Sequence, residues 1–186
     1  MEKKYSVAIY PSQDVIDAVK TMKDYLKSKI DWYNSCNSVA HITICEFTID
    51  ESQIDKYKQK LFKTCDTFTS FQVNLNHFGS YLNGAFFIAP NEDSTNLLKP
   101  IMKKTQEALK PLKLKKSDDP HMSIGRKLIP ENLKIASQLF TTIDLDFLCC
   151  EIVLRELDPI KKQFFVIDTF NFGNNPLPEL IQGSLF

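Results

Sequence analysis

Two histidine motifs of the same pattern constrain this chain more than any other feature. The segments His-Ile-Thr-Ile at 41–44 and His-Met-Ser-Ile at 121–124 are 80 residues apart, and they use two of the three histidines. Each segment alternates polar and apolar residues, which is typical of a strand with one face toward a core. His41 then shares a face with Thr43, and His121 with Ser123. The pair predicts two related strands that present an imidazole and a hydroxyl to one cleft.

The segments around the two motifs predict comparable sets of strands and helices. Tyr5–Tyr10 is expected to be a strand followed by a helix from Ser12, and 39–47 a strand followed by a helix that opens at Asp50. The remaining expected elements are a hairpin of 68–78 with 84–89, a helix over 94–109, a loop over 110–119, a strand at 121, a helix from Pro130, a long strand over 145–157 and a closing strand over 163–172. We therefore expect an α+β fold duplicated into two lobes, with antiparallel sheets flanked by helices around a central cleft and related by a pseudo-twofold axis. Residues 1–175 form this single bilobal domain in our interpretation, and 176–186 form an irregular C-terminal tail.

Composition indicates a globular protein without a global electrostatic field. The 186 residues are 43% hydrophobic, and 23 basic residues balance 23 acidic ones. A balanced charge favours a short oligonucleotide or a nucleotide over a long nucleic acid as partner. The five cysteines lack the CxxC spacing of a zinc or redox site, so we expect free thiols. Without a long apolar segment, we expect a cytoplasmic monomer that does not bind membranes.

The two motifs carry the groups that phosphodiester chemistry needs. One imidazole takes a proton from the attacking oxygen, and the other gives a proton to the leaving oxygen. The hydroxyls of Thr43 and Ser123 would bind the non-bridging phosphate oxygens. Arg126 would add a charge-assisted contact to the phosphate, provided that a bulge at Gly125 turns it away from the face of Ile124. This scheme requires neither a metal nor a cofactor.

HITI at 41–44 and HMSIGR at 121–126, with the early strand SVAIYP, resemble the two-histidine phosphoesterase superfamily, which includes 2'-5' RNA ligases and cyclic nucleotide phosphodiesterases. The resemblance implies a bilobal fold in which His41, Thr43, His121 and Ser123 line a central cleft, without a cofactor. It predicts a metal-independent phosphoesterase for a 2',3'-cyclic phosphate or 2'-5' phosphodiester of RNA or a nucleotide. Glu46 stands where the second motif has Arg126, so the halves are chemically unequal. The sequence leaves open which histidine is the acid and whether the enzyme hydrolyses or ligates.

Three other interpretations of the motifs remain open from the sequence. A non-catalytic RNA-binding or nucleotide-binding module could keep the phosphate cleft without turnover, and a structural scaffold could carry the motifs incidentally. His41, Cys45 and His121 could hold a metal, since His41 and Cys45 would share a strand face, but a fourth ligand is not evident.

Several residues outside the motifs are weaker candidates for the site. We interpret His77 as a cross-strand or cleft-edge residue outside the catalytic set. The lysines at 110, 113, 115 and 116 are interpreted as solvated surface. Three aromatic residues could stack on a base if they border the cleft, namely Tyr10, Tyr81 and Phe47. Trp32 and Tyr33 fit either a ligand contact or a loop anchor.

Overall fold

The elements of the fold follow the predicted order closely. The computed structural model describes residues 1–111 and 113–176. Its helices are α1 (Gln13–Ile30), η1 (Glu51–Gln53), α2 (Ile54–Asp66), α3 (Glu92–Leu109) and α4 (Pro130–Leu139). Its strands are β1 (Glu2–Ile9), β2 (Ile42–Asp50), β3 (Phe71–Tyr81), β4 (Ala85–Pro90), β5 (Leu114–Lys116), β6 (Met122–Gly125), β7 (Leu145–Cys149), β8 (Glu151–Asp158) and β9 (Gln163–Asn171).

The arrangement of the strands is symmetric about the central pair β6 and β2. The strands pair as β7-β3-β4-β6-β2-β1-β8-β9, with β5 beside β2, and every pairing is antiparallel. Thus β1 flanks β2 as β4 flanks β6, and β8 and β3 come next on the two sides. The first lobe contains β1, β2, β8 and β9, and the second lobe contains β3, β4, β6 and β7. The predicted α+β fold of two lobes with antiparallel sheets is confirmed. The two sheets are joined at their centre by a single residue pair, Ile42 with Met122.

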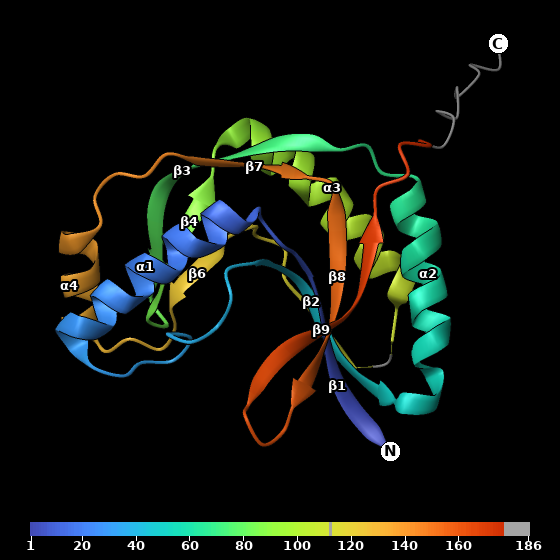
Figure 1. Ribbon diagram of the computed structural model, residues 1–186, viewed down its shortest axis with the longest axis horizontal. Coiled ribbons are helices and arrows are strands. Elements are labelled where there is room, and N and C mark those ends of the chain that lie inside the picture. Colours follow the sequence, from blue (N-terminus) through green and yellow to red (C-terminus); the bar gives the residue numbers. More distant parts are fainter. Residues whose placement is uncertain (112, 177–186) are drawn as a thin grey trace, which may run out of the picture.

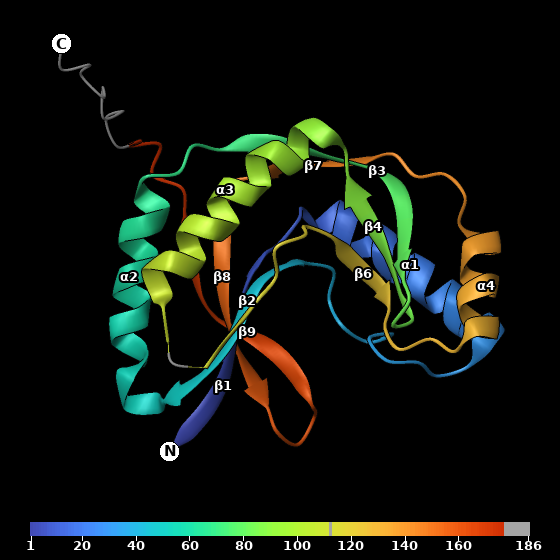
Figure 2. The same ribbon diagram turned by 180° about the vertical axis from the view of Figure 1, so that it is seen from behind.

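The helices cover the lobes in a crossed arrangement. Helix α1 follows β1 in the chain but packs on β6 and β7 of the other lobe, where α4 covers β4. Helix α3 follows β4 and packs on β2 of the other lobe as well as on β3, and α2 packs beside it on β8 and β9 (Figures 1 and 2). Each half of the chain therefore contributes a helix to the opposite lobe. Because of this exchange, the two lobes share one continuous core.

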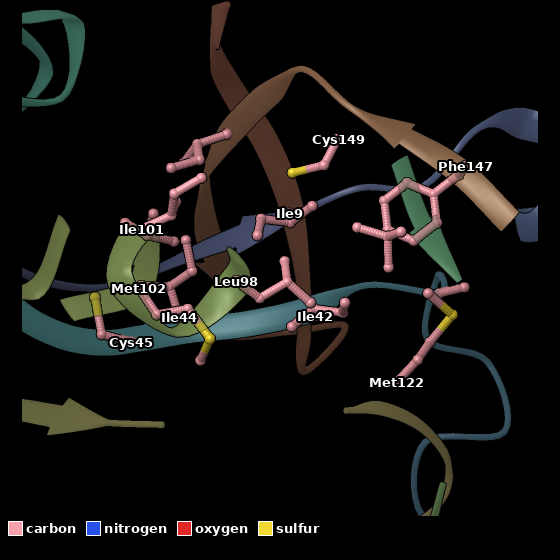
Figure 3. Packing of buried hydrophobic residues seen from close by; sticks show 14 of the residues in the cluster. Ile9, Ile42, Ile44, Cys45, Leu98, Ile101, Met102, Met122, Phe147 and Cys149 are labelled. Carbon is pink, nitrogen blue, oxygen red and sulfur yellow. The ribbon is translucent and has the colours of Figure 1, made fainter. Parts of the chain in front are cut away.

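The buried residues of the two motifs anchor the central strands in that core. Ile42, Ile44, Met122 and Ile124 are fully buried, and Ile42 and Met122 lie near Phe147 in Figure 3. Burial of each such side chain stabilises the fold by about 1.5–3 kcal/mol. This anchoring fixes which face of each strand remains for polar residues.

Two predicted boundaries differ from the structure for a physical reason. The expected strand over 145–157 divides at Cys150, because β7 pairs with β3 in one lobe and β8 pairs with β1 in the other. The expected loop over 110–119 contains β5, which pairs with β2 between Phe47 and Cys45. That part of β2 diverges from β6, and β5 supplies partners to backbone groups that would otherwise form a free edge.

The end of the described chain is tied to α2. The backbone N–H groups of Gly173, Asn174 and Asn175 donate to the carbonyls of Cys65, Phe68 and Asp66. The predicted tail over 176–186 lies outside the described residues, apart from Pro176. Among the described helices, none is both long and apolar enough to cross a membrane.

Candidate active site

The central strand pair brings the two histidine motifs together. Since Ile42 pairs with Met122, the antiparallel register places Thr43 across from His121 and Ser123 across from His41. All four side chains alternate with buried residues, so they share the face opposite the core, where each is half-buried. The two histidines are diagonal neighbours across this pair, a relation that corresponds to about 7–8 Å between Cα atoms. The pairing therefore gathers two imidazoles and two hydroxyls on one face of the sheet.

Each motif strand has a bulge at the equivalent residue. On β2, Ala8 pairs with Thr43 but Val7 pairs with Cys45, which skips Ile44. On β6, Phe87 pairs with Ser123 but Phe86 pairs with Gly125, which skips Ile124. A bulge of this kind shifts the alternation of the residues beyond it by one position.

The bulges decide where three predicted residues point. Beyond the bulge of β6, Arg126 returns to the face of His121 and is exposed, as its predicted role requires. Glu46 returns in the same way to the face of His41 and is half-buried. Cys45 is turned into the core and is 0% exposed, so the expectation that it shares a face with His41 is wrong. Burial also raises the pKa of the Cys45 thiol to about 12, which disfavours the thiolate that binds metals.

Matching hydrogen bonds orient the two imidazoles. His41 Nδ1 lies 2.6 Å from the carbonyl oxygen of Val39, and His121 Nδ1 lies 2.9 Å from that of Asp119. A carbonyl oxygen has no proton to give, so Nδ1 must be the donor in both rings. In each neutral ring, Nε2 therefore keeps a free lone pair. Both histidines thus present the same nitrogen for proton transfer.

Aromatic rings support both imidazoles. Tyr10 stacks on His41 with ring centroids 6.2 Å apart. Phe87 and Tyr81 lie 4.9 Å and 5.7 Å from the ring of His121, and the Tyr81 hydroxyl donates to Asp119. Tyr10 and Tyr81 thus border the motif residues, as candidates for base stacking should. Phe47 does not, because it is 2% exposed and packs in the core against Tyr5 and Tyr57.

Two buried cations near His41 were missed by the sequence analysis. The pKa of His41 is held well below its ordinary value, first by burial and next by the charge of Arg155, with smaller effects of Lys23 and Arg126. The bond to Val39 opposes this shift. Lys23 and Arg155 are 2% and 3% exposed. Lys23 shares the buried face of α1 with Val19 and Leu26, and Arg155 follows the apolar run 152–154; a charge at such a position was the only signal in the sequence.

The weaker candidates are distributed around the site. His77 is exposed, its ring bonds to Asn76, and it borders a cavity of about 420 Å³ that Phe87 and Asp119 also line, which places it at the cleft edge. The lysines at 110, 113, 115 and 116 are exposed, as predicted.

Of the two aromatic residues in the loop before the first motif, Tyr33 alone is buried. Trp32 is 65% exposed, whereas Tyr33 is buried and its hydroxyl donates to the Lys23 carbonyl, which makes it a loop anchor. All five cysteines are free thiols. Within the described part of the chain, no group of three His, Cys, Asp or Glu residues is placed to hold a metal ion.

The fold and the paired motifs define a bilobal protein of the two-histidine phosphoesterase class. The chain belongs to the 2'-5' RNA ligase superfamily, whose family model matches residues 12–159. No curated protein matches the sequence.

Solved structures from bacteria and yeast share the fold at low sequence identity. E. coli LigT complexed with 3'-AMP is 9% identical with a TM-score of 0.67, and the match covers 92% of this chain and 99% of LigT. TT0787 of Thermus thermophilus is 16% identical with a TM-score of 0.61, covering 94% of this chain and all of TT0787 (100%). Kluyveromyces marxianus Usb1 is 14% identical with a TM-score of 0.57, covering 91% and 98% of the two chains.

Proposed function

We propose that this protein is a metal-independent phosphoesterase that acts on a 2',3'-cyclic phosphate or a 2'-5' phosphodiester of RNA or a nucleotide. The observation that carries the proposal is the matched bonding of the two imidazoles. Each Nδ1 is tied to the carbonyl two residues earlier, so both Nε2 atoms are available beside the hydroxyls of Thr43 and Ser123. A structural pair of histidines would not need the same tautomer twice.

The proposed hydrolysis divides proton transfer between the histidines. One Nε2 accepts a proton from water as the water oxygen attacks phosphorus. The other imidazole, protonated at Nε2, gives its proton to the ribose oxygen as the bond from that oxygen to phosphorus breaks. Thr43 and Ser123 donate hydrogen bonds to the non-bridging oxygens and stabilise the charge that grows there. In ligation, a 5'-hydroxyl takes the place of water: it loses its proton to the same base, its oxygen attacks phosphorus, and the ribose 3'-oxygen leaves with the proton from the acid.

The unequal surroundings of the histidines favour one assignment of these roles. Burial and nearby cations lower the pKa of His41, and they keep its imidazole neutral near pH 7. A neutral imidazole suits the group that accepts a proton from water. We therefore assign His41 as the base in hydrolysis and His121 as the acid.

Arg126 and the comparison with LigT support a nucleotide phosphate as substrate. The exposed guanidinium of Arg126 is on the face of His121 and suits a phosphate oxygen. LigT has been crystallised with phosphate and with 3'-AMP. Both are small ligands that contain the group proposed to bind here.

Turnover of a 2',3'-cyclic mononucleotide and a short oligonucleotide with a 2',3'-cyclic end tests the proposal. Native protein should open the ring in excess chelator, and His41→Ala and His121→Ala should each lose roughly 10²-fold or more in kcat. His77→Ala is the matched control, because His77 borders the cleft outside the motifs, and it should keep most of the activity. Binding without turnover in the native protein would favour the non-catalytic module instead. Activity that persists in both motif variants would exclude the two-histidine mechanism.

A further inference from the structure

Arg155 is a buried cation on the cleft side of the first lobe. It pairs with Ser6 across β8 and β1, and Ser6 pairs in turn with Glu46 across β1 and β2. Cross-strand partners share a face of the sheet, so this row lies on the same face as His41. Arg155 is 3% exposed, and it donates a hydrogen bond of 2.6 Å to Ser6 Oγ.

The charge of Arg155 has no carboxylate partner among the described residues. Glu46, the acidic residue of its row, attracts the charge of Arg155 from a distance but forms its ion pair with Lys4 at 2.7 Å. Arg155 Nε is buried and also lacks a hydrogen-bond partner. A buried guanidinium without an ion-pair partner in contact is costly, and an apolar side chain of similar volume is often at least as favourable. Stability therefore does not explain why an arginine is buried here, which points to an effect of Arg155 on its neighbours.

Arg155 is connected to His41 through one aromatic ring. The guanidinium carbon lies 5.8 Å from the centroid of the Tyr10 ring, whose other neighbour is the imidazole of His41 at 6.2 Å. The ring of Phe164, 5.3 Å from the guanidinium carbon, also packs against Arg155. Such contacts of a cation with aromatic faces are attractive and hold the rings in place.

The second lobe has a different group at the equivalent position. Ala8 and Phe87 are the partners of Thr43 and Ser123, so Ser6 corresponds to Ala85, two residues earlier in each strand. Ser6 pairs with Arg155, and Ala85 pairs with Tyr81. Arg155 therefore corresponds to Tyr81, which packs on His121 and donates to the Asp119 carboxylate. One histidine has a cation at this position, and the other has a phenol bonded to a carboxylate.

We propose that Arg155 is a positioning residue for the proton acceptor His41: it holds Tyr10 against the imidazole, and its buried charge disfavours the imidazolium form. This inference rests on the proposed function and deepens it, because it identifies what makes the two histidines unequal. Arg155 does this without contact with the substrate.

The other charged groups around His41 do not replace Arg155. Arg126, which follows β6, is exposed, so solvent screens its charge. Lys23 of α1 is buried and keeps its charge where His41 titrates, since its own pKa is about 8, but its effect on His41 is smaller than that of Arg155. Glu46 of β2 carries the opposite charge but is paired with Lys4. The remaining titratable neighbours are Tyr10 and, across the cleft, His121.

The test is an NMR titration of the His41 imidazole, which does not depend on turnover. The two contacts of Tyr10 place the guanidinium within about 12 Å of the imidazole. A charge at that distance shifts a pKa by roughly 0.3 to 1 unit. Arg155→Met and Arg155→Gln should therefore raise the pKa of His41 by this amount, and His41→Ala identifies the resonance. Lys161→Met removes an exposed charge from the β8–β9 turn and should leave the titration unchanged.

Arg155→Lys separates charge from simple packing. It keeps the positive charge and should leave the pKa of His41 within about 0.2 unit of the native value, far less than the neutral variants. If the native enzyme turns over the cyclic nucleotide, the acid limb of kcat/KM should move to higher pH in the neutral variants alone. The proposal is overturned if His41 titrates in both neutral variants as it does in native protein. It is also overturned if neither neutral variant folds, since the role of Arg155 would then be structural. If turnover is absent but the titration shifts, the proposed function fails while the effect of Arg155 on His41 stands.

Discussion

Lys23 makes the stability of this protein depend on pH in a direction that can be calculated. The side chain is 2% exposed, and Nζ donates to the Ser38 carbonyl at 2.7 Å, the Ser38 hydroxyl at 3.0 Å and the Ser35 carbonyl at 3.2 Å. These acceptors carry no charge, so burial lowers the pKa of Lys23 from 10.5 to about 8. Between these two pH values the unfolded chain binds a proton that the folded protein has released. Stability therefore rises with pH across this window.

The size of the effect follows from the two pKa values. Each unit of difference corresponds to 1.36 kcal/mol, so Lys23 contributes an increase of roughly 3 kcal/mol between about pH 7 and pH 11. Buried thiols act in the opposite direction in part of this range. Burial raises the pKa of Cys45 and Cys65 to about 12, so their contribution to stability falls as the pH rises above the ordinary value of 9. The stability curve of native protein alone would mix the two effects.

The difference between native protein and Lys23→Met isolates the lysine. Methionine keeps much of the buried stem and removes the titrating group. We would measure urea unfolding of both proteins, with reductant and at constant ionic strength, from about pH 7 to pH 11. The free energy of unfolding of native protein minus that of the variant should increase by roughly 3 kcal/mol over this range. Parallel curves for the two proteins would refute the argument that burial lowers the pKa of Lys23.

Three further predictions concern the proposed site and its support. Thr43→Val and Ser123→Ala should each lower kcat for a cyclic phosphate by roughly 10²-fold or more, while the thermal unfolding temperature changes little. Near-native kinetics in both variants would show that the hydroxyls take no part in the mechanism. Gly84→Ala should lower the free energy of unfolding by about 1–3 kcal/mol in urea titrations, because φ of Gly84 is +80° and an added Cβ would lie 2.3 Å from the Leu128 carbonyl oxygen. Unchanged stability would contradict this geometry. Phe47→Ala should lower the free energy of unfolding by about 3–5 kcal/mol and leave KM for a nucleotide unchanged, whereas a raised KM in the folded variant would show that Phe47 contacts the substrate.

The alternation within the two motifs was sufficient to predict the central strands and their faces. Ile42 and Met122 are buried, and the polar residues beside them share the opposite face, because a strand has a side-chain period of two. The order of strands and helices followed from hydrophobic periodicity and from turn residues, which act locally. These parts of the fold depend on interactions between residues that are near in sequence.

The tertiary structure decided features that depend on partner strands. The bulges at Ile44 and Ile124 arise from the register with β1 and β4, and they turn Cys45 inward and Arg126 outward. The break at Cys150 exists because β7 and β8 belong to different lobes. Gly125 gave a local signal for the bulge of β6, whereas the bulge of β2 and the break at Cys150 leave no local pattern in the sequence.

The sequence by itself determined the family, the two-lobed architecture and the four motif residues as candidates, because each is specified by a local pattern that occurs twice. The sequence showed that the two halves differ at Glu46 and Arg126, but only the tertiary structure showed that buried cations lie near His41. Arg155 is 114 residues from His41 in the chain, and it comes near only because β1 lies between β8 and β2. Electrostatic influence depends on distance in space and on burial, and a single sequence specifies neither for residues so far apart.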